Sequence, residues 1–125
     1  MTYLDTHAAA WLRAGDPSAF DKTGRRILET DDELLISPIV LLELQMLFEK
    51  KRLSRPPHAI LSDLTAYGGV RVCDFPFLPV IESANRETWT RDPFDRIITA
   101  HARLRAARLL TQDALIRENY ELAVW

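Results

Sequence analysis

The sequence predicts a single α/β domain, residues 1–125, with a largely parallel sheet. Short apolar runs alternate along the chain with segments of helical periodicity, which is the pattern of strands joined by crossover helices. Pairs of a capping residue and proline come before three of the helical segments, at positions 16–17, 37–38 and 92–93. No repeat, low-complexity tract or linker divides the chain, so one domain is expected.

The first half of the chain is expected to contain two strands and four helices. Asp16, followed by Pro17 at the first helical position, predicts the start of the second helix. Ser37 and Pro38 start the third helix in the same way, and glycines at 68–69 end the fourth. The expected elements are a strand at 3–4, helices at about 7–13 and from 17 through 28, a strand at 34–36, and helices at about 39–51 and 60–67.

The second half adds three strands and three helices. Cys73, the only cysteine, is expected as a buried thiol in a strand, and its solitude excludes an internal disulfide and a cysteine-cluster zinc site. Asp92 before Pro93 caps a long helix. The expected elements are a strand at 70–73, helices at about 79–88 and 94–107, a strand at 108–110, a helix at 114–119 and an edge strand at 122–124.

Composition narrows the class of protein. The chain is 47% hydrophobic and 27% charged, which is ordinary for a soluble globular protein. No apolar run approaches the roughly 20 residues that cross a membrane, and no signal peptide is visible, so we expect no membrane association and a cytoplasmic location. A net charge of −2 lacks the basic footprint of a dedicated nucleic-acid-binding domain. A nuclease is still compatible with this charge, because metal ions offset clustered carboxylates locally.

Two acids directly follow predicted strands. Asp5 comes after the first strand and Asp113 after the strand at 108–110. In open α/β sheets the functional crevice lies beyond the carboxyl ends of the strands, so the two carboxylates are neighbours if their strands are neighbours. The alternative role for each is to cap the helix that follows it.

Two further acids lie on helices. Glu43 sits in the helix at 39–51, which is apolar almost all round and is therefore either deeply buried or shared with a partner. A carboxylate there is paired or metal-bound if it is buried, and otherwise reaches solvent along a narrow polar face. Asp95 falls at the third position of its helix, where an acid favours the positive helix end but also lies near the crevice. Capping alone explains Asp92.

These four acids together suit a hard divalent cation, which carboxylate oxygens bind. Without a cation the carboxylates should repel one another, so some of their pKa values should rise. Arg91 and Arg96, which flank the Asp92–Asp95 turn, are candidates for contacting a phosphate, for pairing with these acids, or for plain surface pairing.

Four ordered motifs resemble PIN-domain ribonucleases, and most closely the VapC-type toxins of bacterial toxin–antitoxin pairs. The motifs are YLDTH at 3–7, ISPIVLLEL at 36–44, RDPFDRIITAHA at 91–102 and LLTQD at 109–113. The resemblance implies a three-layer α/β/α domain with a parallel central sheet of about five strands in the order 3-2-1-4-5. It also implies an endoribonuclease that needs Mg²⁺ or Mn²⁺.

The family's site residues correspond to six positions of this chain. The resemblance makes the four acids both catalytic and metal-binding, and it gives the hydroxyls beside two of them a supporting role: Asp5, Glu43, Asp95, Asp113, Thr6 and Thr111. It further implies a homodimer, an RNA substrate and a cognate antitoxin whose tail covers the acidic pocket. Position 101 is His where many relatives have Gln, and we expect His101 to pack or to hydrogen-bond rather than to act in catalysis.

Three other classes of protein fit the sequence less well. A phospho-receiver domain needs an acid cluster after the first strand and a lysine at the last, whereas Asp5 stands alone and residues 122–124 have no lysine. A haloacid-dehalogenase-like phosphatase needs Asp-x-Asp, where this chain reads Asp5-Thr6-His7. A non-catalytic PIN-like binding module stays open, although the intact set of four acids disfavours it.

Overall fold

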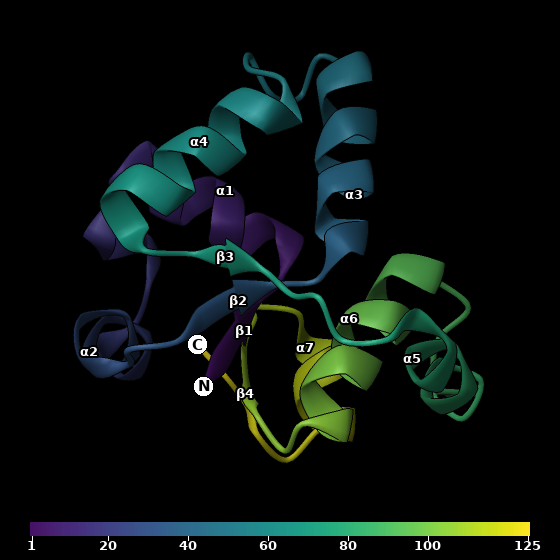
Figure 1. Ribbon diagram of the computed structural model, residues 1–125. Helices are drawn as coiled ribbons and strands as arrows, with labels where there is room; N and C mark the ends of the chain where they lie inside the picture. Colours follow the sequence, from purple (N-terminus) through teal and green to yellow (C-terminus); the bar gives the residue numbers. More distant parts are fainter.

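A sheet of five short strands forms the centre of the protein in the computed structural model, which describes residues 1–125 apart from the side chain of Pro17 (Figure 1). The strand order is β3-β2-β1-β4-β5, and every neighbouring pair is parallel. The strands are β1 (Thr2–Leu4), β2 (Leu34–Ile36), β3 (Arg71–Val72), β4 (Arg108–Leu110) and β5 (Ala123–Val124). The predicted α/β class and strand order are confirmed.

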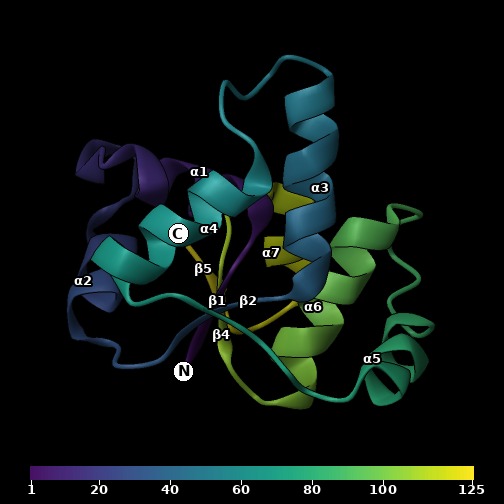
Figure 2. The ribbon, with the colours of Figure 1, turned by 45° about the horizontal axis from the view of Figure 1, so that its top comes forward.

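Helices cover the sheet on both sides. Figures 1 and 2 show α1 and α4 against one side, with α3 rising beside them, and α5 and α6 on the other. The helices are α1 (Thr6–Ala14), the 3₁₀ turn η1 (Pro17–Ala19), α2 (Lys22–Thr30), α3 (Pro38–Glu49), α4 (Pro57–Gly68), α5 (Phe77–Ala84), α6 (Pro93–Leu104) and α7 (Ala114–Asn119). Within the described part of the chain, none of these helices has the length and apolar character to span a bilayer.

The register of the sheet decides which residues meet at its functional edge. Leu4, at the end of β1, pairs with Ile36 at the end of β2 and with Leu110 at the end of β4. The three central strands therefore end level with one another. Asp5 and Thr111, which follow β1 and β4 directly, emerge side by side beyond the carboxyl ends of neighbouring strands, where ligands bind in sheets of this kind.

The central strands are buried on both faces. Tyr3, Leu4 and Leu109 have no exposed surface, as expected for the near-continuous apolar strands of a parallel sheet between helices. The Cys73 thiol is also buried, with its Sγ 2.9 Å from the Tyr3 hydroxyl oxygen. The prediction of a buried thiol is confirmed, but Cys73 lies directly after β3 rather than in the strand.

The start of α2 differs from the prediction. Asp21, not Asp16, caps this helix, and its Oδ1 accepts the Gly24 N–H at 3.0 Å. Asp16 instead accepts the Ser18 N–H at 3.0 Å within the turn that precedes the helix, so its capping group is used locally. A Cβ on Gly24 would lie 2.9 Å from the Trp125 carbonyl carbon, so the absence of a side chain lets α2 approach the C-terminal residue.

The end of α6 also differs from the prediction. The helix ends at Leu104 rather than near residue 107, because Ala106 adopts a left-handed conformation with φ 48°. The Ala107 N–H then bonds back to the Ala102 carbonyl at 2.9 Å, which closes the helix with the turn that glycine usually makes. An alanine gives no sequence signal for such a turn.

Helix α3 is not deeply buried, so that alternative of the sequence analysis is wrong. Only Val40 and Leu44 are buried among its side chains. Leu42 is 51% exposed and Met46 37% exposed. These two side chains give α3 an exposed apolar surface.

Candidate metal centre

Asp5 is fixed at the carboxyl end of β1 by two hydrogen bonds. Its Oδ1 accepts the Ala8 N–H at 2.7 Å, which caps α1, and its Oδ2 accepts the Thr111 hydroxyl at 2.5 Å. Asp5 is only 7% exposed. Capping and a role in the site are therefore compatible for this residue, because each oxygen keeps a free lone pair.

Thr111 links the two acids that follow the strands. Its hydroxyl donates to Asp5 and accepts the Asp113 N–H at 3.1 Å. The Asp113 side chain is exposed, and its Oδ1 accepts the Ile116 N–H at 2.9 Å as the cap of α7. The predicted neighbourhood of Asp5 and Asp113 follows from the pairing of β1 with β4.

Asp95 completes the cluster from the first turn of α6. Its half-buried carboxyl lies in the field of four other acids, which are Asp92, Asp113, Glu43 and Asp5. Burial, reinforced by these negative charges, raises the pKa of Asp95 to about 7. Acids from four separate segments of the sequence thus act on one carboxyl group.

Asp5 also has a raised pKa, and burial is the main cause. The Thr111 and Ala8 hydrogen bonds and the His7 charge oppose the rise, and the Glu43 charge adds a smaller amount to it. The pKa values of Asp5 and Asp95 are thus raised as expected, but burial contributes more to the rise than repulsion between the acids. The neighbouring Thr6 hydroxyl is buried and has no hydrogen-bond partner among the described residues.

Asp92 has the capping role that the sequence assigned to it. Its Oδ1 accepts the N–H groups of Phe94 at 2.8 Å and Asp95 at 3.1 Å. The basic neighbours of this turn do not pair with the acids. Arg91 donates to the Thr88 carbonyl at 3.0 Å and Arg96 donates to the Thr90 carbonyl at 2.7 Å, so both arginines brace the backbone before α6.

A surface pocket of about 360 Å³ opens beside Asp5 and Asp113, and its other lining residues are His7, Trp11 and Gln112. Neither Trp11 nor Gln112 is among the site residues expected from the sequence. The signal for Trp11 was available, because it lies four residues after the exposed His7 on the same face of α1.

The donor set fits a hard divalent cation in chemistry. Asp5, Glu43, Asp95 and Asp113 offer carboxylate oxygens only, the ligands that Mg²⁺ and Mn²⁺ favour. Among the described residues, no group of three or more His, Cys, Asp or Glu side chains lies close enough together to hold a metal ion as the side chains stand. Mg²⁺ usually keeps several waters and takes only one or two carboxylates directly, so a loose set of acids is adequate for it.

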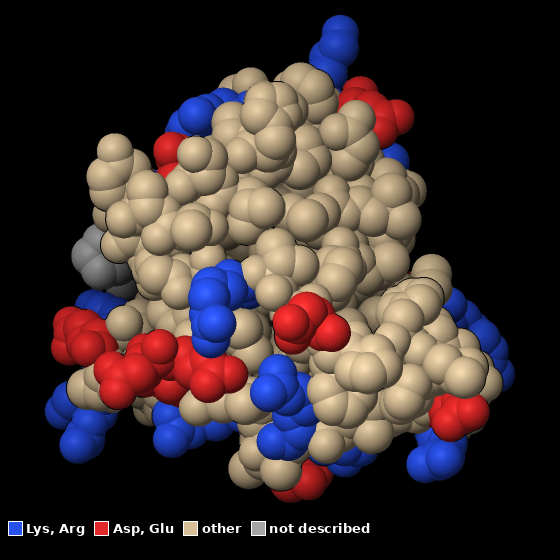
Figure 3. Space-filling model, in the orientation of Figure 1, with Lys and Arg blue, Asp and Glu red and all other residues tan. Residues whose placement is uncertain are grey.

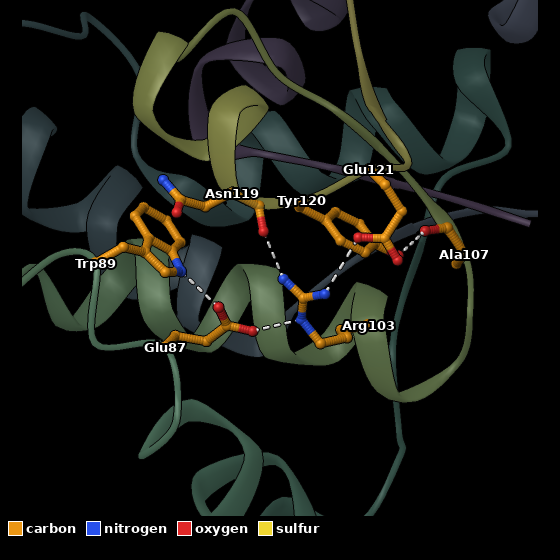
Figure 4. Close-up of polar contacts among 7 residues, drawn as sticks. All are labelled: Glu87, Trp89, Arg103, Ala107, Asn119, Tyr120 and Glu121. Atoms are coloured by element: carbon orange, nitrogen blue, oxygen red, sulfur yellow. Dashed lines mark hydrogen bonds and ion pairs between the residues drawn. The ribbon is translucent and has the colours of Figure 1, made fainter.

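Arg103 ties together the segments that carry these acids (Figure 4). Its Nε donates to Glu87 at 2.7 Å, and Glu87 also accepts the Trp89 indole N–H at 2.5 Å. The same guanidinium donates to the Asn119 carbonyl at 2.7 Å and to Glu121 at 3.3 Å. The connection before α6, α6 itself and the end of α7 are thereby held in one arrangement.

His101 packs instead of hydrogen-bonding. It is 1% exposed, its ring stacks on Tyr3 with 5.8 Å between centroids, and neither ring nitrogen has a partner among the described residues. Burial, with a smaller effect of the Arg105 charge, lowers the pKa of His101 to about 4. The imidazole is therefore neutral at physiological pH, and of the two roles expected for His101, packing or hydrogen bonding, the structure shows packing.

We expect His101 to make the protein acid-sensitive. Between pH 6.5 and about 4 the unfolded chain binds a proton that the folded chain rejects, so the free energy of unfolding should fall as the pH falls. The loss should reach about 3 kcal/mol. Urea unfolding at pH 7, 6, 5 and 4 should give a shallower decline for His101→Gln than for wild type. Equal declines would contradict the assignment.

The sequence profile of the PIN domain matches residues 2–122. The chain belongs to the PIN domain family. Ribonuclease VapC22 of Mycobacterium tuberculosis is 31% identical over 119 residues, which cover 93% of this chain and 89% of that protein. This PIN domain is therefore similar to a VapC protein over nearly its whole length.

Solved structures share the fold at low sequence identity. VapBC2 of Rickettsia felis, bound to a DNA fragment from its promoter, matches with a TM-score of 0.65 and 19% identity over 99% of this chain and 98% of that one. A toxin–antitoxin complex of Klebsiella pneumoniae matches with a TM-score of 0.64 and 18% identity over 100% and 97% of the two chains. At these identities the likeness shows the PIN fold alone.

Proposed function

We propose that this PIN domain is an endoribonuclease that hydrolyses RNA phosphodiester bonds with Mg²⁺ or Mn²⁺ and acts as the toxin of a toxin–antitoxin pair. The observation that carries the proposal is the position of the half-buried Asp95 carboxyl among four other acids, whose charges add to the effect of burial in raising its pKa to about 7. Such crowding destabilises a folded protein unless a bound cation offsets it. The similarity to a protein named as a ribonuclease supports the same activity.

In the proposed mechanism the carboxylates of Asp5, Glu43 and Asp95 would ligate the cation. Asp113 would be the fourth acid of the binding site. A bound divalent cation supplies Lewis acidity toward the scissile phosphate and lowers the pKa of a water molecule. Thr111 keeps the Asp5 carboxylate oriented by donating to its Oδ2, and Ala8 fixes the other oxygen.

The test is cleavage of a mixed-sequence RNA by wild type and by Asp5→Asn, with Mg²⁺, Mn²⁺ or EDTA. We expect wild type to cleave with either metal and to stop in EDTA. Asp5→Asn should lose roughly 100-fold or more in rate, because neutral amide oxygens hold a divalent cation poorly. The asparagine can still accept the Ala8 N–H, so the cap of α1 persists.

Asp21→Asn is the matched control. Asp21 caps α2 as Asp5 caps α1, but it is exposed and outside the acid cluster. Its variant should cleave like wild type. Cleavage that continues in EDTA, or full activity of Asp5→Asn, would refute the metal mechanism.

The partners are part of the same proposal. An antitoxin tail can block the acids by placing an Arg or Lys side chain among them, since charge-assisted hydrogen bonds to carboxylates are strong. We propose that the protein acts in the cytoplasm, where RNA is available. Its expression without a partner should then arrest the growth of the cells, and Asp5→Asn should relieve this arrest. Growth arrest that persists with the Asp5→Asn variant would show that toxicity does not depend on the acids of the site.

A homodimer is the proposed use of the exposed apolar side chains of α3 and α5. These are Leu42 and Met46 on α3 with Phe77, 55% exposed, and Leu78, 68% exposed, on α5. Large exposed apolar side chains of this kind mark association surfaces. Sedimentation equilibrium of the purified chain should give twice the monomer mass, and a monomer at all concentrations would contradict the dimer.

A further inference from the structure

A second cavity adjoins the acidic pocket. It lies between α1 and the connection from α3 to α4, at residues 50–56, and has a volume of about 310 Å³. His7 and Trp11 line both cavities, so these two side chains form the wall between them. A ligand that extends past the acids on this side must therefore cross the Trp11 ring.

The rim of this cavity is basic. Arg13, Arg52 and Arg55 line it, above apolar side chains from α3, α4 and the connection. Asp63 pairs with two of them, through one oxygen that lies 3.2 Å from Arg13 and 2.5 Å from Arg55. One carboxylate against three guanidinium groups leaves a net positive rim. Arg52 is exposed and has no carboxylate partner among the described residues.

The basic character continues along the connection. Lys50 and Lys51 precede Arg52 and are exposed. Figure 3 shows blue side chains at the top of the molecule, with red ones near them, over the region where α3 meets α4 in Figure 1. In a chain of net charge −2, this positive surface beside an acidic pocket gives a polyanion a place to bind.

Trp11 is held as a fixed aromatic wall. Its ring meets Trp125 edge-on at 5.3 Å between centroids, and Phe20 stacks on Trp125 at 4.7 Å. The His7 ring also contacts it, with 5.7 Å between centroids and an angle of 45° between the ring planes. A ring fixed in this way provides a stacking surface at little entropic cost, which single-stranded nucleic acids use together with basic grooves.

We infer that this arginine cavity binds the RNA nucleotide next to the one held at the acids. Its base lies against Trp11, and Arg52 and Arg55 bind the flanking phosphates. The volume, near the lower end of the range of about 300–1,000 Å³ for small-ligand sites, suits one nucleotide. An acidic peptide would satisfy the arginines, but it would not use the aromatic wall that joins the cavity to the acids. The inference deepens the proposed function and rests on it.

The experiment measures binding without cleavage. A fluorescein-labelled RNA of 12 random nucleotides is titrated with the intact wild-type chain in EDTA, by fluorescence anisotropy at several salt concentrations. We expect Arg52→Ala and Arg55→Ala each to weaken binding about 3- to 10-fold and to reduce the slope of log Kd against log salt by about 0.7, the value for one lost phosphate contact on a single strand. Trp11→Phe, which keeps an aromatic ring, should weaken it less than Trp11→Ala.

Arg26→Ala is the matched control, since Arg26 is an exposed arginine on α2 that does not line the cavity. Its affinity and salt slope should equal those of wild type. If Arg52→Ala and Arg55→Ala behave like this control, the inference is overturned. It is also overturned if a ten-residue glutamate peptide binds in an Arg52-dependent way while RNA does not.

Failure of this inference and failure of the proposed function give different results. If RNA binding depends on the arginines but RNA is not cleaved in Mg²⁺ or Mn²⁺, the cavity binds RNA and the proposed enzyme activity is disproved. If RNA is cleaved in a metal-dependent way, and Arg52→Ala has unchanged affinity and unchanged kcat/KM, the enzyme activity stands and the role of the cavity is disproved.

Discussion

Replacing Asp95 by asparagine is expected to stabilise the metal-free protein while it removes cleavage of RNA. The folded chain holds a proton on this carboxyl up to a pH of about 7, whereas the unfolded chain releases it near 3.8. Between these two values the folded state binds more protons, so the free energy of unfolding falls as the pH rises. Above pH 7 the full electrostatic cost remains in the folded state.

Asparagine carries no charge and removes that cost. In EDTA at pH 8 we expect Asp95→Asn to raise the free energy of unfolding by about 1–3 kcal/mol, a value discounted because solvent screens a half-buried group. At pH 4 the gain should vanish, since wild type is then protonated. Cleavage with Mg²⁺ should fall roughly 100-fold or more. Mg²⁺ should stabilise wild type more than the variant.

Asp92→Asn is the control, because it removes a charge three residues away and can keep the cap of α6. It should retain cleavage and give a smaller gain in stability. Urea unfolding at the two pH values, with and without Mg²⁺, measures all of these quantities. An Asp95→Asn variant that is less stable than wild type at pH 8, or that cleaves normally, would show that this carboxyl is not crowded by the site.

The placement of the acids was predictable because it depends on local signals. Asp5 and Asp113 each follow a short apolar strand and cap the next helix, and both facts can be recognised within about six residues of sequence. The parallel sheet then brings them together, since β1 pairs with β4. The proximity of Asp5 and Asp113 is thus a consequence of strand order, which the resemblance implied and the sheet confirms.

The structural features that the sequence did not predict depend mostly on contacts between residues far apart in the chain. Arg103 bonds to Glu87 across 16 positions and to Glu121 across 18, so no periodicity marks it. Ala106 adopts a left-handed conformation, which a sequence usually indicates by a glycine at that position. The second role of Trp11 required knowing that the connection after α3 folds over α1.

Removing the Glu87 carboxylate should cause the largest loss of stability. Glu87 is 4% exposed, and Glu87→Ala would leave the Trp89 indole N–H and the Arg103 guanidinium without their shared acceptor. The loss should be about 2–3 kcal/mol, because the Trp89 N–H is left without an acceptor while the Arg103 guanidinium, 36% exposed, keeps Glu121 and the Asn119 carbonyl. For a domain of this size that corresponds to a fall in Tm of roughly 6–15 °C.

Glu121 offers an unusually close comparison, because it pairs with the same guanidinium. Its side chain is 72% exposed, whereas that of Glu87 is 5% exposed. Glu121→Ala should therefore cost less than about 1 kcal/mol. Glu87→Gln should lie between the two variants, since it keeps an acceptor but loses the charge. Thermal unfolding of the three variants in EDTA gives the ranking, and equal losses from Glu87→Ala and Glu121→Ala would show that burial does not govern this network.

The expected loss has a functional consequence because of where Arg103 acts. It joins α6, which carries Asp95, to the carbonyl at the end of α7, the helix that Asp113 caps. Loosening this joint would let the like charges of Asp95 and Asp113 move apart, so Glu87→Ala should weaken Mg²⁺ binding as well as the fold. At a temperature where the variant is still folded, a Mg²⁺ titration followed by near-ultraviolet circular dichroism should show a raised Kd for Glu87→Ala and an unchanged one for Glu121→Ala. An unchanged Kd in both would mean that the acids keep their arrangement without the network.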